Sequence, residues 1–151
     1  MDLHIAGKKA IICASSKGLG KACALSLSRE GVIVYMNGRN EQTLEDAVKE
    51  IYLETGNPVF GIVADITTED GRLKLSSACP DADILVTNNE GPKPGKFEDW
   101  GRDEYIQAFD ANMLGPVLMI RALLPGMKER QFGRIVNITS AMVKAPSPHQ
   151  G

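Results

Sequence analysis

Short apolar runs and segments of helical period alternate along the whole chain. The apolar runs are rich in β-branched residues, as strands buried on both faces of a sheet are, and we expect strands at Lys9–Ala14, Val32–Asn37, Val59–Ala64, Asp83–Thr87 and Arg134–Thr139. Between them, apolar positions recur at helical spacing in Leu19–Glu30, Glu41–Thr55, Glu69–Ala78, Asp103–Asn112 and Leu114–Arg130. Regular alternation of this kind predicts an α/β fold in which helices cover both faces of a doubly wound parallel sheet.

Glycine and proline mark several expected helix boundaries. Gly31 and Gly56 follow the first two helical segments and are plausible C-terminal stops. Pro116 lies near the start of the last helix, where a proline is tolerated. Pro125 lies further inside the same segment, so we expect it to kink or shorten that helix.

Length and composition restrict the class of protein. The 151 residues are suited to a single domain, and the formal net charge of −2 comes from scattered rather than clustered charges. We therefore expect no nucleic-acid partner and no membrane anchor, and instead small molecules or other protein chains. The cysteines form no CxxC motif and the two histidines lie at opposite ends of the chain, so no metal site is predicted. Without an apolar leader or a membrane-length stretch, the expected location is cytoplasmic.

The turn after the first predicted strand is the clearest candidate binding motif. Its sequence Cys-Ala-Ser-Ser-Lys-Gly-Leu-Gly ends at Gly20 and opens into a helix, whose free N–H groups suit a phosphate. A Gly-x-Gly pair in this context often does no more than let a helix pack close to a sheet, and that alternative stays open. A P-loop is excluded because Lys21 is followed by Ala22 rather than by Ser or Thr.

Two basic residues favour a particular dinucleotide. Lys17 lies in the turn, and Arg39 follows the second predicted strand, where an NAD enzyme would usually carry Asp or Glu to bind the ribose hydroxyls. A guanidinium and an ammonium favour a 2′-phosphate, which a carboxylate would repel. The predicted cofactor is NADP(H). The alternative is that both side chains are merely solvated, as most surface charges are.

Further polar residues stand where later strands end, which is the ligand-binding edge of an open α/β sheet. Asp65-Ile66 follows the third strand, Asn88-Asn89-Glu90-Gly91 the fourth, and Ser140 the fifth, while Asn112 lies within a helical region. In this order the residues resemble the short-chain dehydrogenase/reductase family, and particularly its NADP-dependent members similar to 3-oxoacyl-carrier-protein reductases. The resemblance implies a Rossmann-like fold, hydride transfer between NADP(H) and a carbonyl or alcohol substrate, and a homo-oligomer in the full-length form.

The resemblance also implies a role for each residue. The first turn would bind the pyrophosphate, and the residues expected to contact the cofactor there are Ala14, Ser16, Lys17, Gly18, Leu19 and Gly20. Lys17 and Arg39 would hold the 2′-phosphate, and Asp65 would accept from the adenine amino group beside Ile66. Asn88 and Asn89, followed by Gly91, would secure the middle of the sheet next to the cofactor. Asn112 would position a water in a proton relay, and Ser140 would hydrogen-bond the substrate oxygen.

Some of these residues also have plain structural interpretations. Asp65 could be the N-cap of a helix that begins near Thr67, and Asn112 could be a helix cap. Ser140 could be a loop hydroxyl with no chemical role.

Three departures from the family pattern affect these expectations. Cys13-Ala14 replaces the usual Thr-Gly, which keeps the turn small but gives up the freedom of glycine at positive φ. Glu90 replaces the usual Ala and is expected to place a carboxylate near the nicotinamide side. No tyrosine has a lysine four residues later, as the family's proton-donating Tyr-x-x-x-Lys requires: the residues at that spacing from Tyr35, Tyr52 and Tyr105 are Arg39, Gly56 and Phe109.

The chain therefore resembles only the N-terminal part of the family. We expect residues 1–151 to form one dinucleotide-binding domain that is incomplete on its C-terminal side, and that binds cofactor but catalyses very poorly. The alternative is a non-catalytic nucleotide-binding or interaction module that naturally ends here.

Overall fold

The computed structural model describes residues 2–92 and 94–145, and it confirms the predicted Rossmann-like α/β fold. The strands are β1 (Lys9–Ile12), β2 (Ile33–Gly38), β3 (Val59–Val63), β4 (Ile84–Thr87) and β5 (Arg134–Asn137). They form one parallel sheet in the order β3-β2-β1-β4-β5. The helices are α1 (Gly18–Arg29), α2 (Glu41–Thr55), α3 (Glu69–Ala78), α4 (Arg102–Phe109) and α5 (Gly115–Glu129).

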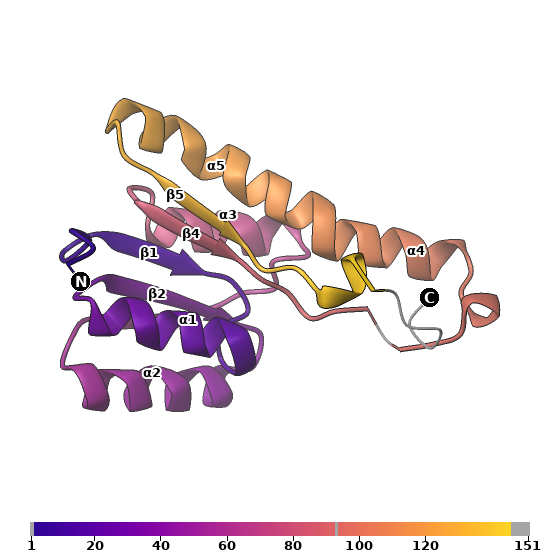
Figure 1. The fold of residues 1–151 in the computed structure, drawn as a ribbon, viewed down its shortest axis with the longest axis horizontal. Coiled ribbons are helices and arrows are strands. Elements are labelled where there is room, and N and C mark those ends of the chain that lie inside the picture. Colours follow the sequence, from indigo (N-terminus) through magenta and orange to yellow (C-terminus); the bar gives the residue numbers. More distant parts are fainter. Residues whose placement is uncertain (1, 93, 146–151) are drawn as a thin grey trace.

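Helices cover both faces of the sheet, α1 and α2 on one and α3 and α5 on the other (Figure 1). Strand β1 shows why its sequence is apolar throughout. Ala10 and Ile12 pack toward α1 and α2, whereas Ile11 lies in the second core with α3 and α5. Because alternate side chains of a strand point to opposite faces, a strand covered on both sides has no polar face.

The last two helices form one continuous helical rod rather than two separate helices. A π-helical segment, Asp110–Leu114, joins α4 to α5 with helical backbone angles on both sides. In Figure 1 the α4 end of the rod extends past the sheet. Of the two effects expected of Pro125, a kink or a shorter helix, the second is wrong, because α5 continues to Glu129. Pro125 is exposed, so the backbone carbonyl that its ring deprives of a partner one turn earlier can bond water.

Two of the predicted strands, β1 and β5, were two residues too long at the carboxyl end. β1 stops at Ile12 rather than at Ala14, and β5 stops at Asn137 rather than at Thr139. In both cases the chain leaves the sheet to form a turn. These turns, together with those after β2, β3 and β4, build the candidate site.

Candidate functional site

A cavity of about 300 Å³ opens at the carboxyl edge of the sheet, where the turns after β1, β2, β3 and β4 meet. Its walls contain most of the residues expected to contact a cofactor: Ala14, Ser16, Lys17, Gly18, Leu19, Arg39, Asp65, Ile66, Asn88 and Asn89. Asn37, Gly38, Ala64 and Glu90 complete the lining. Residues remote in sequence are thus brought to one place, at the edge where open α/β sheets bind their ligands.

The N-terminus of α1 forms one wall of this cavity and suits an anion. Lys17 occupies the N-cap position, where no side chain accepts from the first turn, and that turn contains no acidic residue. Gly18 has φ +58° and open space around it, so the backbone is uncovered. The first N–H groups of a helix lack partners within it and carry the positive end of its dipole. This wall therefore fits a pyrophosphate.

Gly20 has a packing role beneath the same turn rather than a place in the cavity wall. A Cβ there would collide with the backbone carbonyl of Ala14 and approach the Asn88 side chain. The glycine lets α1 pack directly against the end of β1. The alternative offered by the sequence, a glycine for close helix packing, thus applies to Gly20, while Gly18 provides the open backbone.

Asn37 is a buried residue that hydrogen-bonds neighbouring segments of the site, a role that was not predicted from the sequence. Its side chain, 2% exposed, donates to the carbonyls of Ile62 and Ala64, and its Oδ1 accepts from the Ala14 N–H at 3.3 Å. Ser15, also buried, accepts from the Asn37 N–H through Oγ at 2.9 Å. Asn37 thereby fixes three strand ends relative to one another. The available signal was an amide inside an apolar strand, directly before Gly38 and Arg39.

Ala14 has a positive φ, which is unfavourable for alanine and was not expected from the sequence. The replacement of a glycine by alanine was expected to give up positive φ, yet Ala14 has φ +45°. An L-residue in this region costs about 1–2 kcal/mol. The surrounding hydrogen bonds hold the turn in place, because the Ala14 carbonyl also accepts from Asn88 Nδ2 at 3.1 Å.

The two asparagines after β4 connect the sheet to different neighbours. Asn88 bonds the β1 turn, while Asn89 donates through Nδ2 to the carbonyl of Ala111 at 2.7 Å. Ala111 lies in the π-helical segment next to Asn112. The pair therefore joins the cavity to the helical rod.

Arg39 projects from the end of β2 and is paired with Glu90, with 2.5 Å between Nη2 and Oε2. The Glu90 carboxylate reaches across to the turn after β2, and Glu90 also lines the second cavity described below; the expectation that it lies near the nicotinamide side stays a prediction. Lys17, by contrast, makes no salt bridge among the residues that the structure describes.

Asp65 forms a local turn rather than a helix cap. Its Oδ1 accepts from both the backbone N–H and the hydroxyl of Thr67, and the N-cap of α3 is Thr68. These hydrogen bonds from Thr67, together with the charge of Arg39, lower the pKa of Asp65. The carboxylate is thus kept ionised at the cavity wall, where it can accept a hydrogen bond.

The two residues expected to take part in chemistry lie outside this cavity. Asn112 lines a second cavity of about 460 Å³ beside the loop after β4, together with Gly91 and Trp100. It is not a helix cap, because it lies inside the π-helical segment and its Nδ2 donates to the Ala108 carbonyl. π-Helical turns occur frequently at functional sites.

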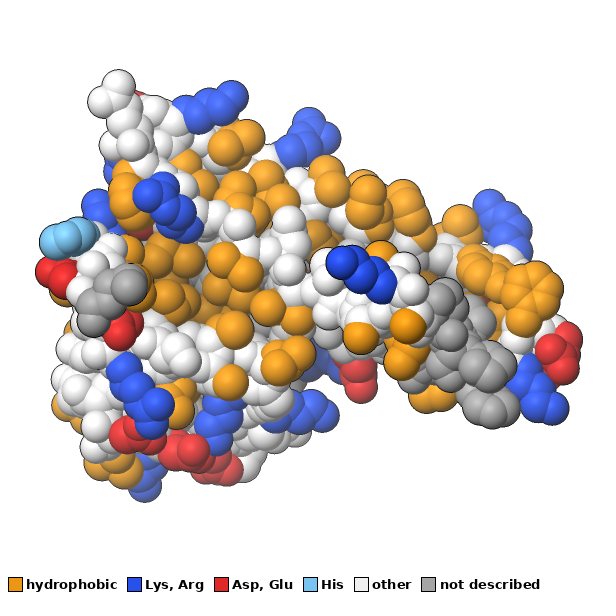
Figure 2. Space-filling view, in the orientation of Figure 1, with side chains coloured by type: hydrophobic (Ala, Val, Ile, Leu, Met, Phe, Trp, Pro, Cys, Tyr) orange, Lys and Arg blue, Asp and Glu red, His pale blue; other side chains and the backbone are white. Residues whose placement is uncertain are grey.

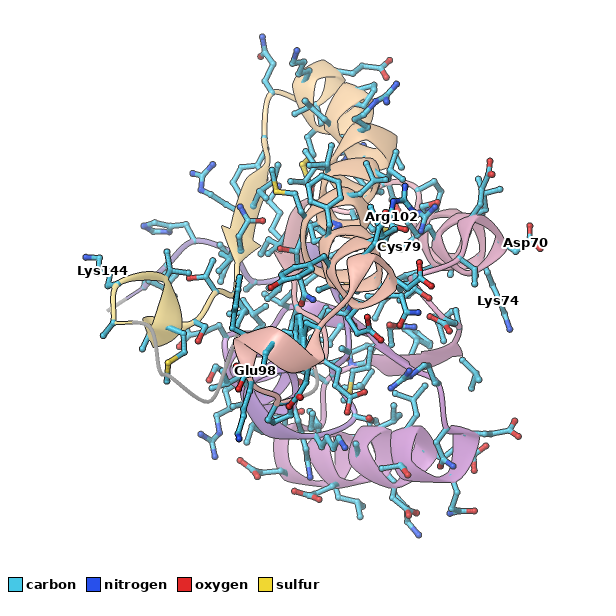
Figure 3. The ribbon with its side chains drawn as sticks, turned by 90° about the vertical axis from the view of Figure 1, so that its right-hand side faces the viewer. Asp70, Lys74, Cys79, Glu98, Arg102 and Lys144 are labelled. Atoms are coloured by element: carbon cyan, nitrogen blue, oxygen red, sulfur yellow. The ribbon has the colours of Figure 1, made fainter. Side chains whose placement is uncertain are left out.

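Ser140 follows β5 and caps a short 3-10 turn, Ala141–Val143, by accepting from the Met142 N–H at 3.1 Å. Its hydroxyl is exposed, so it remains able to donate. Figure 3 shows Lys144, which ends this turn, projecting to the outside of the molecule and away from Glu98. Ser140 thus places an exposed hydroxyl after the end of β5, and Lys144 points away from the molecule.

The two buried cysteines, Cys13 and Cys79, offer no nucleophile. Burial raises the pKa of Cys13 and of Cys79 to about 12, so both thiols are protonated at neutral pH. Along residues 2–92 and 94–145, no helix combines the length and the apolar character that crossing a membrane would require.

Comparison with known proteins agrees with this geometry. Residues 8–151 match the model of the short chain dehydrogenase family. An uncharacterized oxidoreductase of Bacillus subtilis is 35% identical over 148 residues, which cover 97% of this chain and 56% of that protein. The 17-beta-hydroxysteroid dehydrogenase type 3 of Danio rerio is 37% identical over 150 residues, which cover 94% and 48%. The chain therefore spans about half the length of these curated relatives.

Among solved structures, the L-sorbose reductase of Gluconobacter frateurii, in complex with NADPH and L-sorbose, superposes with a TM-score of 0.94. It is 26% identical, and the superposition covers 99% of this chain and 59% of that one. The strand order, the uncapped N-terminus of α1 at the carboxyl edge of the sheet and the family match together identify the chain as a member of the short-chain dehydrogenase family.

Proposed function

We propose that this chain forms the cofactor-binding part of an NADP(H)-dependent oxidoreductase that interconverts a carbonyl and an alcohol. The observation that carries the proposal is the arrangement of two cations, Lys17 and Arg39, on the wall of a cavity that also contains an uncovered helix N-terminus. The helix N-terminus suits the pyrophosphate, and the two cations suit a second phosphate beyond it.

The choice of NADP(H) over NAD(H) depends on charge at the end of β2. An NAD-binding site of this fold places a carboxylate there to accept from the ribose hydroxyls. Here the strand ends in Gly38 and is followed by Arg39. A guanidinium forms charge-assisted hydrogen bonds with a dianionic phosphate and gains much less from a neutral hydroxyl.

The remaining contacts would orient the cofactor. Asp65 would accept from the adenine amino group beside Ile66, and Asn88 would support the turn that holds the pyrophosphate. The cofactor, once bound, supplies or accepts the hydride. Ser140 would hydrogen-bond the substrate oxygen, and Asn112 would hold a water for proton transfer.

The substrate class is a ketone or a secondary alcohol. The reductase of similar structure takes a keto sugar and one curated relative is named for hydroxysteroids, so a shared carbonyl chemistry with varied skeletons supports this class. Within it, the resemblance of the motifs favours a 3-oxoacyl type of substrate.

Titration of the chain with NADPH and with NADH, followed by nicotinamide fluorescence, tests the proposal. We expect tighter binding of NADPH, and in Arg39→Glu a loss of NADPH affinity of about 10- to 150-fold, since a hydrogen bond to a charged group is worth about 1.5–3 kcal/mol. NADH affinity should not fall, because the new carboxylate stands where NAD-binding sites of this fold accept from the ribose hydroxyls.

Arg29→Glu is the matched control. Arg29 is similarly exposed and is also paired with a glutamate, Glu54, but it lies at the far end of α1. Equal affinities for the two cofactors, or an unchanged NADPH preference in Arg39→Glu, would contradict the assignment.

A further inference from the structure

The Arg39–Glu90 ion pair spans the mouth of the proposed cofactor cavity. Arg39 follows β2 and Glu90 follows β4, and these strands are not neighbours, since β1 lies between them in the sheet. The pair therefore passes over the carboxyl end of β1, next to the turn that contains Ala14. Both side chains also line the second cavity, so the pair lies at the boundary between the two.

This pair is well placed to exchange partners. The side chains are 63% and 68% exposed, and solvent-exposed ion pairs contribute only about 0–1 kcal/mol. A dianionic phosphate is a stronger partner for a guanidinium than one carboxylate is. The Glu90 contact can therefore be displaced, but displacing it has a cost.

Negative charge near Arg39 increases the free-energy cost of replacing Glu90 by a phosphate. Asp65 lies on the same cavity wall, and the Arg39 charge contributes to lowering the pKa of its carboxyl group. A phosphate at Arg39 would thus meet two carboxylates at short range, with Lys17 as the second cation on that wall. A neutral 2′-hydroxyl would meet no such repulsion and would leave the Arg39–Glu90 pair intact.

We propose that Glu90 is a specificity-determining residue, which competes with the 2′-phosphate of NADP(H) for Arg39 and so narrows the preference for NADP(H) over NAD(H). This inference rests on the proposed function and refines it. When NADP(H) binds, Arg39 exchanges the Glu90 carboxylate for the phosphate, and Glu90 turns toward solvent. When NAD(H) binds, the pair persists across the adenosine side of the cavity.

The test is the Glu90→Gln variant, which keeps the size of the side chain and removes its charge. We expect its NADPH affinity to rise about three- to fivefold, the factor that corresponds to loss of a competing surface ion pair. NADH affinity should stay within error of the parent chain. A titration with adenosine 2′,5′-bisphosphate against ADP by calorimetry should show the same selective gain, without any contribution from the nicotinamide.

Glu54→Gln is the matched control, because it removes one negative charge and breaks the comparable Arg29–Glu54 pair away from the cavity. It should leave both affinities unchanged. An NADPH affinity in Glu90→Gln that equals that of the parent chain, or a gain that is equal for NADPH and NADH, would overturn the role of Glu90 while leaving the NADP(H) preference in place. A parent chain that binds neither dinucleotide would overturn the proposed function and this refinement with it.

Discussion

The turns after β1 to β4 and the segment from α4 to β5 differ in how firmly their polar residues are held. In the first region Asn37, Asn88 and Ser15 are hydrogen-bonded across strands that are far apart in sequence. In the second region the corresponding bonds are local: Asn112 bonds within its own helical turn, and Ser140 bonds within its own 3-10 turn. The side chains around the first cavity are thus held mainly by tertiary hydrogen bonds, whereas the side chains of Asn112 and Ser140 bond only within their own turns.

Burial shows the same contrast. All of β4 is buried, but β5 beside it is mostly exposed, and no residue of α4 is buried. Figure 2 shows hydrophobic side chains gathered around β5 and along α5. Exposed hydrophobic residues of the helical rod and of β5 include Ile106, Phe109, Met113, Val117 and Val136. β5 pairs with β4 alone among the described strands, so its outer edge has unpaired backbone groups. Such an edge and such apolar surface favour association with another chain.

Turnover should separate the two regions most strongly. We expect the chain to bind NADPH yet reduce a β-ketoester at or near the background rate, because none of its tyrosines has a lysine four residues later. Loss of a general acid typically removes about 10²–10⁴-fold in rate. The measurement is NADPH consumption by absorbance, with cofactor binding confirmed in the same sample. Ordinary saturation kinetics from the pure chain would contradict this prediction, because they would mean that the chain contains a working proton donor.

Val86 and Val136 provide a matched pair within one ladder. They are directly opposite in the β4–β5 register, but Val86 is 2% exposed and Val136 is 47% exposed. We expect Val86→Ala to lower the free energy of unfolding by about 2 kcal/mol, because it leaves a cavity in the core. Val136→Ala should cost less than about 1 kcal/mol. Urea denaturation followed by circular dichroism measures both. Equal losses of stability would mean that, in solution, β5 is as deeply buried as β4.

Ala14→Gly should give the smallest effect and the opposite sign. Glycine removes the strain of φ +45°, which is about 1–2 kcal/mol, but adds entropy to the unfolded chain, so we expect a net stabilisation of up to about 1 kcal/mol. Ala24→Gly is the control, since Ala24 is buried inside α1 and glycine there should destabilise by about 1 kcal/mol. Thermal unfolding of both variants decides the matter. Destabilisation by Ala14→Gly would show that the turn relaxes in solution.

The sequence was least informative where a side-chain orientation or a strand end depends on contacts with residues distant in sequence. Glu90 stands next to the residues expected to bind the cofactor. Nothing in its local sequence indicates that its carboxylate pairs with Arg39 after β2. The ends of β1 and β5 were extended too far for a related reason. Apolar residues continue past the last paired residue of each strand, and only pairing with a neighbouring strand decides where the strand stops.

What the sequence determined by itself was the fold class and the identity of the residues along one edge of the sheet. These follow from local physics, since apolar runs buried on both faces and helical periods leave few other arrangements. The tertiary structure alone decided that Asn37 ties three strand ends together, that Ala14 is held at positive φ, and that Arg39 has a carboxylate partner. Each of these depends on hydrogen bonds or ion pairs between residues on different turns, which local sequence does not encode.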